Sequence, residues 1–175
     1  MNRAGLTYAE ILMALVILAV ALVPLLSQFY IGFQGSRVGR DITIATNLAE
    51  DLIDEIRSKR FDENPPPSQP VPLSKLGPDA NESRYNLPAV GPNFDDVDDY
   101  HGLNEDPPKD LAGTALTDFS GFIRSVTVNY VTIIGSGDTW QDYDRRTDNK
   151  KVLVMVAMAN DSISPIGLEL VVTNY

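Results

Sequence analysis

The chain has no cysteine and a single histidine among its 175 residues. The absence of cysteine excludes disulfide bonds, thiolate metal sites and cysteine nucleophiles. No Gly-x-Ser-x-Gly, His-Glu-x-x-His or phosphate-binding loop signature occurs either. The one histidine, His101, lies in a polar segment, where we expect it to be exposed. The sequence therefore predicts that the protein is not an enzyme.

Positive charge is also scarce, with 14 basic against 24 acidic residues and a net charge of −10. Nucleic-acid binding needs a clustered basic face, and no stripe of Lys and Arg is present. The short basic clusters have acidic neighbours, so we expect solvated surface at Arg57-Ser58-Lys59-Arg60, Arg145-Arg146 and Lys150-Lys151. This composition argues against a nucleic-acid partner.

Apolar residues are concentrated near the N-terminus. From Ile11 to Ser36 no side chain is charged, a span of 26 positions. About 20 apolar residues cross a bilayer as a helix, and a proline such as Pro24 is tolerated there. The run therefore predicts a membrane-spanning helix. A buried helix of a soluble domain and a cleaved secretory signal are the alternatives, although no small-x-small cleavage site follows Leu26.

The charges that flank this run do not support a cytoplasmic N-terminus. Arg3 alone precedes the run, whereas Arg37 and Arg40 follow it. Basic residues normally gather on the cytoplasmic side of a membrane helix. On charge alone, the opposite orientation stays open.

Glu10 stands immediately before the apolar run, where an ionised carboxylate is costly unless it has a partner. The segment Gly5-Leu6-Thr7-Tyr8-Ala9-Glu10 resembles the type IV prepilin signature. That signature is a short basic leader ending in glycine, followed by a mature chain with Thr second and Glu fifth. Leu6 departs from the phenylalanine usual at its place, and Tyr8-Ala9 replaces the usual aliphatic pair.

This resemblance implies a specific processing of the chain. A prepilin peptidase would cut between Gly5 and Leu6 on the cytoplasmic face and methylate the new amine of Leu6. Glu10 would then pair with the N-terminal amine of a neighbouring subunit in a filament. Such a buried pair fixes register, because a mismatched subunit leaves a charge alone.

After the apolar run the sequence becomes amphipathic. Apolar residues recur at steps of three and four, the pattern of a helix with one buried stripe: Val38, Ile42, Ala45, Ala49, Leu52, Ile53 and Ile56. Asn64 and the three prolines after it are expected to end the helix. One helix of about 50 residues is predicted on the basis of this spacing. The run Ala45–Arg57 is also similar to a segment of minor pilins and minor pseudopilins.

Residues 62–118 are predicted to form an irregular, proline-rich region, either a surface for partners or a spacer. Within it, Phe94-Asp95-Asp96-Val97-Asp98-Asp99-Tyr100 resembles a segment of some minor pilins. Hard cations bind clustered oxygens, so calcium is a candidate ligand of Asp95, Asp96, Asp98 and Asp99, although no cofactor is required. The alternative is a solvated acidic loop with Phe94, Val97 and Tyr100 turned inward.

Residues 119–175 are predicted to form an antiparallel sheet. The strands are expected at Phe122–Ile134, Lys151–Met158 and Leu168–Thr173, as a meander with one face against the helix. The second strand is expected to be buried on both faces because its apolar run is nearly continuous. The predicted class is α+β, with segments 1–5 (leader), 6–33 (membrane helix), 34–61 (amphipathic helix), 62–118 (variable region) and 119–175 (sheet).

The resemblance implies a minor pilin, a subunit that primes or caps a type IV pilus. A minor pseudopilin of a type II secretion system, which shares the same physics, is the second hypothesis. A signal-anchored periplasmic binding domain that never assembles is a third hypothesis. The first two imply a single-pass inner-membrane protein with a periplasmic C-terminal domain that later joins a filament. The expected partners are prepilin peptidase, other pilin or pseudopilin subunits, an assembly platform protein and the inner membrane.

Overall fold

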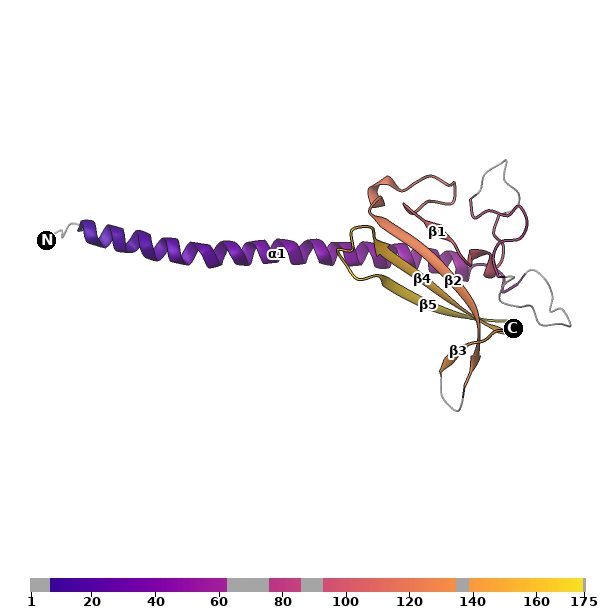
Figure 1. Cartoon of the computed structure of the whole chain (residues 1–175). Coiled ribbons are helices and arrows are strands. Elements are labelled where there is room, and N and C mark those ends of the chain that lie inside the picture. The colour runs from indigo at the N-terminus through magenta and orange to yellow at the C-terminus, as the bar shows by residue number, and fades with distance from the viewer. Residues whose placement is uncertain (1–6, 63–75, 86–92, 135–138, 175) are drawn as a thin grey trace. The chain divides into compact units, whose positions relative to one another are not determined.

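The structure is a computed structural model that describes residues 7–62, 76–85, 93–134 and 139–174 (Figure 1). Its elements in chain order are helix α1, the 3-10 helix η2, strand β1, the 3-10 helix η3 and strands β2 to β5. The chain divides into two compact units, one up to Asp41 and one from Ile42 onward. The predicted α+β class is confirmed by the long helix and the antiparallel sheet.

Helix α1 (Tyr8–Arg57) is a single element of 50 residues, as the sequence predicts, and Pro24 lies inside it. It ends before Asn64 and the prolines, so the predicted end is too late. The backbone N–H of Arg60 instead donates to the carbonyl of Asp95, 3.2 Å away. The chain has therefore left the helix and contacts a distant segment before the prolines.

In the unit up to Asp41, α1 exposes apolar side chains along its length. The large apolar side chains from Ile11 to Phe33 are 42 to 70 % exposed. Within the described residues, α1 is the one helix long and apolar enough to cross a membrane, as an anchor or as a signal segment. Apolar surface of this extent needs a cover, either lipid or another protein.

The unit from Ile42 onward contains the sheet. Its strands are β1 (Asn104–Glu105), β2 (Phe122–Ile133), β3 (Trp140–Asp142), β4 (Asn149–Met158) and β5 (Ile166–Thr173). The order is β1-β2-β4-β5, β3 pairs with the C-terminal end of β2, and every pairing is antiparallel (Figure 1). The predicted meander is confirmed as β2, β4 and β5. β1 has two residues and no periodicity from which it could be predicted.

The core of this unit lies between the later part of α1 and one face of the sheet. The buried stripe of α1 consists of Ala45, Leu48, Ala49, Leu52, Ile53 and Ile56. Alternate residues of β2 and β4 face it: Val126, Val128, Val152, Val154 and Val156. The prediction that this part of β4 is buried on both faces is wrong, because α1 covers one face only and Leu153 and Met155 on the other are half-buried.

Candidate functional site

Glu10 lies in the first turn of α1 and is bonded to Thr7. The backbone N–H and the hydroxyl of Thr7 donate to Oε2 of Glu10 over 3.0 and 3.1 Å. In return, the backbone N–H of Glu10 donates to Oγ1 of Thr7 over 3.4 Å. This reciprocal arrangement is a capping box, which satisfies donors that a helix leaves unpaired at its N-terminus.

The capping box gives Glu10 a partner within its own chain. A Thr-x-x-Glu spacing before an apolar run is a sequence signal for this cap. Both residues are exposed, so the carboxylate is accessible to a second partner. Gly5 and Leu6, the predicted cleavage and methylation positions, lie outside the described residues.

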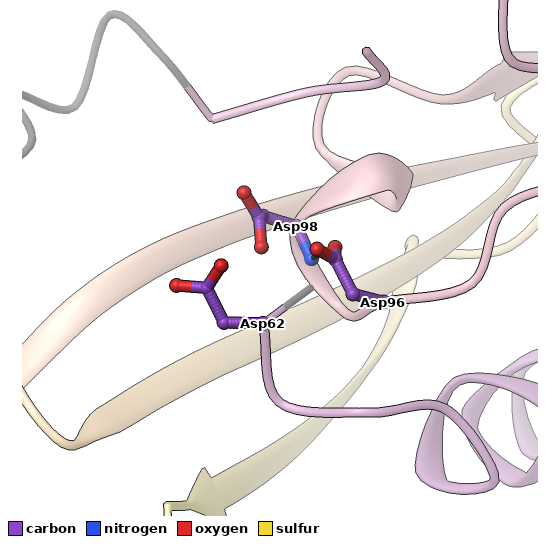
Figure 2. A group of neighbouring side chains, drawn as sticks. All are labelled: Asp62, Asp96 and Asp98. Atoms are coloured by element: carbon purple, nitrogen blue, oxygen red, sulfur yellow. Dashed lines mark hydrogen bonds between the residues drawn. The ribbon is translucent and has the colours of Figure 1, made fainter. Parts of the chain in front are cut away.

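The four aspartates predicted to bind one calcium ion separate into two groups of carboxylates. In each group, one carboxylate oxygen of every residue lies within 4.8 Å of the others. The groups are Asp62, Asp96 and Asp98 (Figure 2), and Glu82, Asp95 and Asp99. Each group takes one member from a segment distant in sequence, so local spacing could not have predicted either set.

The first group, which we call the Asp62 group, lies against two cations of the chain. Nζ of Lys150 is 2.5 Å from Oδ1 of Asp98, and a guanidinium nitrogen of Arg146 is 2.5 Å from Asp62. Lys150 is fully buried and also donates to the carbonyl of Phe61. The expectation that Lys150 and Arg146 are solvated surface is therefore wrong. Burial raises the pKa of Asp98 to about 7, although the ammonium of Lys150 opposes the shift.

The second group, which we call the Glu82 group, forms fewer ion pairs with Lys and Arg side chains than the Asp62 group does. Arg60 forms an ion pair with Asp95. Oδ2 of Asp99 accepts the backbone N–H groups of Asp95 and Asp96 over 2.9 and 3.1 Å. Burial raises the pKa of Asp99 to about 7, and the backbone donors oppose that rise. Oδ1 of Asp95 is a buried acceptor without a donor in the described part of the chain.

Calcium takes six to eight oxygen ligands, more than three carboxylates supply unless several bind through both oxygens or backbone carbonyls and water contribute. The Glu82 group suits such an ion better, because Arg146 and Lys150 already form ion pairs with two of the three carboxylates of the Asp62 group, Asp62 and Asp98. Calcium binding stays a prediction, and the Glu82 group is the better candidate site of the two.

A buried chain of ion pairs links the helix to the sheet. Arg84 donates to both carboxylate oxygens of Glu55, over 3.0 and 2.5 Å, and to Oε1 of Glu105 over 2.8 Å. Arg124 donates two hydrogen bonds to Oε2 of Glu105, over 2.9 and 2.6 Å. Two carboxylates and two guanidinium groups alternate, so their charges cancel.

The remaining contacts of this network tie it to the core. The hydroxyl of Tyr100 donates to Glu55 over 2.6 Å, and that of Tyr85 donates to Glu105 over 3.1 Å. Burial, reinforced by Glu105, raises the pKa of Tyr85 to about 12. Arg124 also donates to the backbone carbonyl of Leu48 in α1. The network thus joins α1, the 76–85 segment, β1 and β2, and no local sequence pattern predicts it.

His101 is half-buried, so the expectation that it is exposed is wrong. Its Nδ1 accepts the backbone N–H of Val128 over 3.1 Å. The ring therefore serves as a hydrogen-bond acceptor for β2, a structural contact that the polar sequence around it does not reveal.

Comparison of the chain with protein-family models, curated proteins and solved structures finds no significant match. The architecture nevertheless defines a class. A long apolar N-terminal helix, whose later part packs on an antiparallel sheet, is a pilin-like architecture.

Proposed function

We propose that the protein is a minor pilin, a structural subunit that primes or caps a type IV pilus-like filament. The observation that best supports this is the exposed apolar length of α1 between Ile11 and Phe33. Such a helix needs lipid around it in the membrane and neighbouring helices around it in a filament. A minor pseudopilin of a type II secretion system would use the same helix in the same way.

The capping box suggests how Glu10 serves both states. In the membrane, Thr7 supplies the hydrogen-bond donors that the carboxylate needs. In the filament, the methylated amine of a neighbouring subunit would replace Thr7 as the partner and add a full positive charge. A subunit at the wrong axial step would lack this pair, which gives Glu10 its role in register.

The proposal includes a processing route and a set of partners. Prepilin peptidase cleaves after Gly5 and methylates Leu6, and an assembly platform protein then moves the subunit from the inner membrane into the filament. The domain from Ile42 onward is periplasmic before assembly. The role is structural, not catalytic.

Matched substitutions at Glu10 and Thr7 test the assignment of register. Glu10→Gln removes the charge, whereas Thr7→Val keeps the charge and removes the hydroxyl of the cap. If Glu10 pairs with a neighbour, Glu10→Gln abolishes incorporation into filaments, and Thr7→Val reduces it only slightly. Equal effects would mean that capping is the whole role of Glu10. Membrane localisation of both variants serves as the control.

Mass spectrometry of the N-terminus from native membranes tests the processing. The wild-type chain is expected to begin with N-methylated Leu6. The Gly5→Ala variant is expected to keep residues 1–5. An intact N-terminus in the wild type would contradict the proposal and favour an anchored domain that never assembles. Loss of surface filaments, as against loss of exoprotein secretion, in a deletion strain separates pilin from pseudopilin.

A further inference from the structure

Strand β5 forms one edge of the sheet. Its register with β4 runs without a bulge from Asn149 opposite Thr173 to Val156 opposite Ile166. In the described part of the chain, no strand pairs with the other side of β5, which forms the free rim of the sheet in Figure 1. Every second residue of such an edge directs its backbone N–H and C=O away from the sheet, where another strand can pair with them.

Strand β5 has few of the usual protections of an edge strand. Natural edges are blunted by charged side chains, lysine above all, by proline, by bulges or by short length, and the one charged residue of β5 is Glu169. The segment Ile166–Thr173 is eight residues long and contains neither proline nor lysine. The opposite edge of the sheet is different, because β1 and β3 both pair along β2 there.

The core side chains are also less buried at this edge of the sheet than in its centre. Val152, Val154 and Val156 of β4 are fully buried. The apolar side chains on the same face of β5 pack against the core but are only half-buried: Ile166, Leu168, Leu170 and Val172. One more strand beside β5 would cover these side chains, since residues opposite one another on paired strands share a face.

Charge indicates what kind of strand fits. Glu169 lies on the opposite face of β5, is exposed, and forms no ion pair in the described part of the chain. Its neighbour on β4 is Leu153, so the place on its other side is open to a charged residue. With a net charge of −10 for the chain, a basic segment is the complementary occupant.

A second copy of β5 fits this edge poorly. Antiparallel self-pairing about the centre of the strand, with both core faces on one side, places the two Glu169 side chains opposite or diagonal to each other. Like charges at such positions are destabilising. The occupant is therefore a different strand.

We propose that the free edge of β5 binds an extended segment of another protein by strand addition, with a Lys or Arg of that segment facing Glu169. The segment alternates, with apolar residues beside Leu168, Leu170 and Val172 and polar or basic residues on the other face. This inference does not depend on filament assembly, because it rests on the domain from Ile42 onward alone.

A tethered strand tests the proposal at high effective concentration. The full-length chain in detergent is extended after Tyr175 by a glycine-rich turn and an eight-residue strand. Valine alternates with threonine in that strand, and one lysine stands opposite Glu169. Amide hydrogen exchange of β5 is expected to slow by about tenfold or more. A matched strand with proline at alternate positions is expected to leave exchange unchanged.

The charge requirement is tested with the same extension. Glu169→Lys is expected to remove most of the protection given by the lysine strand, and a glutamate in place of that lysine to restore it. Asp118→Lys, an exposed charge reversal in η3 (Thr117–Phe119), is the matched control and should have no effect.

Three results would overturn the proposal. The first is exchange in β5 that the tethered strand does not slow. The second is exchange in the unextended chain that is already as slow in β5 as in β4, which would mean a covered edge. The third is protection of β5 that rises with protein concentration, which would identify a second copy as the occupant.

Discussion

The two parts of helix α1 both carry many apolar residues, but only the later part buries them within its own chain. Leu18 is 60 % exposed, whereas Leu52 is fully buried against the sheet. The same side chain thus stabilises the fold at one position and needs an external partner at the other. The first part of α1 is therefore suited to lipid or to another protein, and the second part is suited to packing within its own domain.

Polar groups in the two parts differ in the same way. Glu10 is bonded to a residue three positions away, whereas Glu55 in the later part accepts hydrogen bonds from Arg84 and Tyr100, 29 and 45 positions away. A local cap can form in an isolated helix and can be exchanged. A buried network can form only when the whole domain has folded, and removing one member leaves charges without a partner.

Truncation of Glu105 is expected to have the largest effect on stability. Glu105→Ala leaves Arg84 and Arg124 buried without their shared carboxylate, at a cost of about 3–5 kcal/mol in the free energy of unfolding. Denaturant unfolding of the full-length chain in detergent, followed by circular dichroism, measures the loss. Asp54→Ala, which removes an exposed pair with Arg57, is the control and should cost no more than about 1 kcal/mol. Similar losses in the two variants would contradict the role of the network.

Matched leucine truncations sharpen the comparison within α1. Leu52→Ala should lower the free energy of unfolding by about 2–5 kcal/mol, because it leaves a cavity in the core. Leu18→Ala should leave the unfolding of the domain unchanged and should reduce membrane insertion or assembly instead. The same unfolding assay, together with membrane fractionation, separates the two outcomes. A loss of domain stability in Leu18→Ala would mean that the first part of α1 packs within its own chain.

The raised pKa of Asp99 predicts a pH dependence confined to the domain. Its folded pKa of about 7 lies above the ordinary value of 3.8, so the folded state holds the proton more tightly. Its contribution to stability is therefore full below about pH 4 and is lost as the pH rises through 7. Asp99 is buried, and the slope for one titrating group is at most about 1.4 kcal/mol per pH unit.

Asp99→Asn isolates this effect. Asparagine keeps the acceptor for the backbone N–H groups and cannot ionise, so the variant should gain stability relative to wild type at pH 8 and not at pH 4. Thermal unfolding at a series of pH values measures the difference. Asp118→Asn, an exposed substitution, should follow the wild-type profile. A constant offset between wild type and Asp99→Asn would show that Asp99 does not titrate in this range.

Calcium should have the smallest effect. If the Glu82 group binds it, the midpoint of thermal unfolding should rise by about a few degrees over that in chelator. Glu82→Gln should abolish the rise, and Asp62→Asn should preserve it, because Arg146 and Lys150 already pair with two of the three carboxylates of the Asp62 group. Equal midpoints in calcium and chelator would remove calcium from the description of this protein.

The site was only partly predictable. The Thr7-x-x-Glu10 spacing is a local pattern, so the cap could have been inferred from sequence. The division of the aspartates was out of reach, because it depends on Asp62 and Glu82 coming from other segments. The burial of Lys150 was out of reach for the same reason. The residues next to it in sequence give no indication that its ammonium donates to Asp98 and to the carbonyl of Phe61.

The sequence by itself determined the main elements of this protein, helix α1 and strands β2, β4 and β5. The uncharged run after Glu10, the three- and four-residue spacing around Leu52 and the alternation in β2 are periodic, and periodicity reflects the local geometry of helices and strands. Only the tertiary structure decided which charges are buried and which strand edge stays open. Glu55, Arg84, Glu105 and Arg124 are stabilised by one another across long stretches of chain, and such pairing depends on the path of the backbone, which no local pattern encodes.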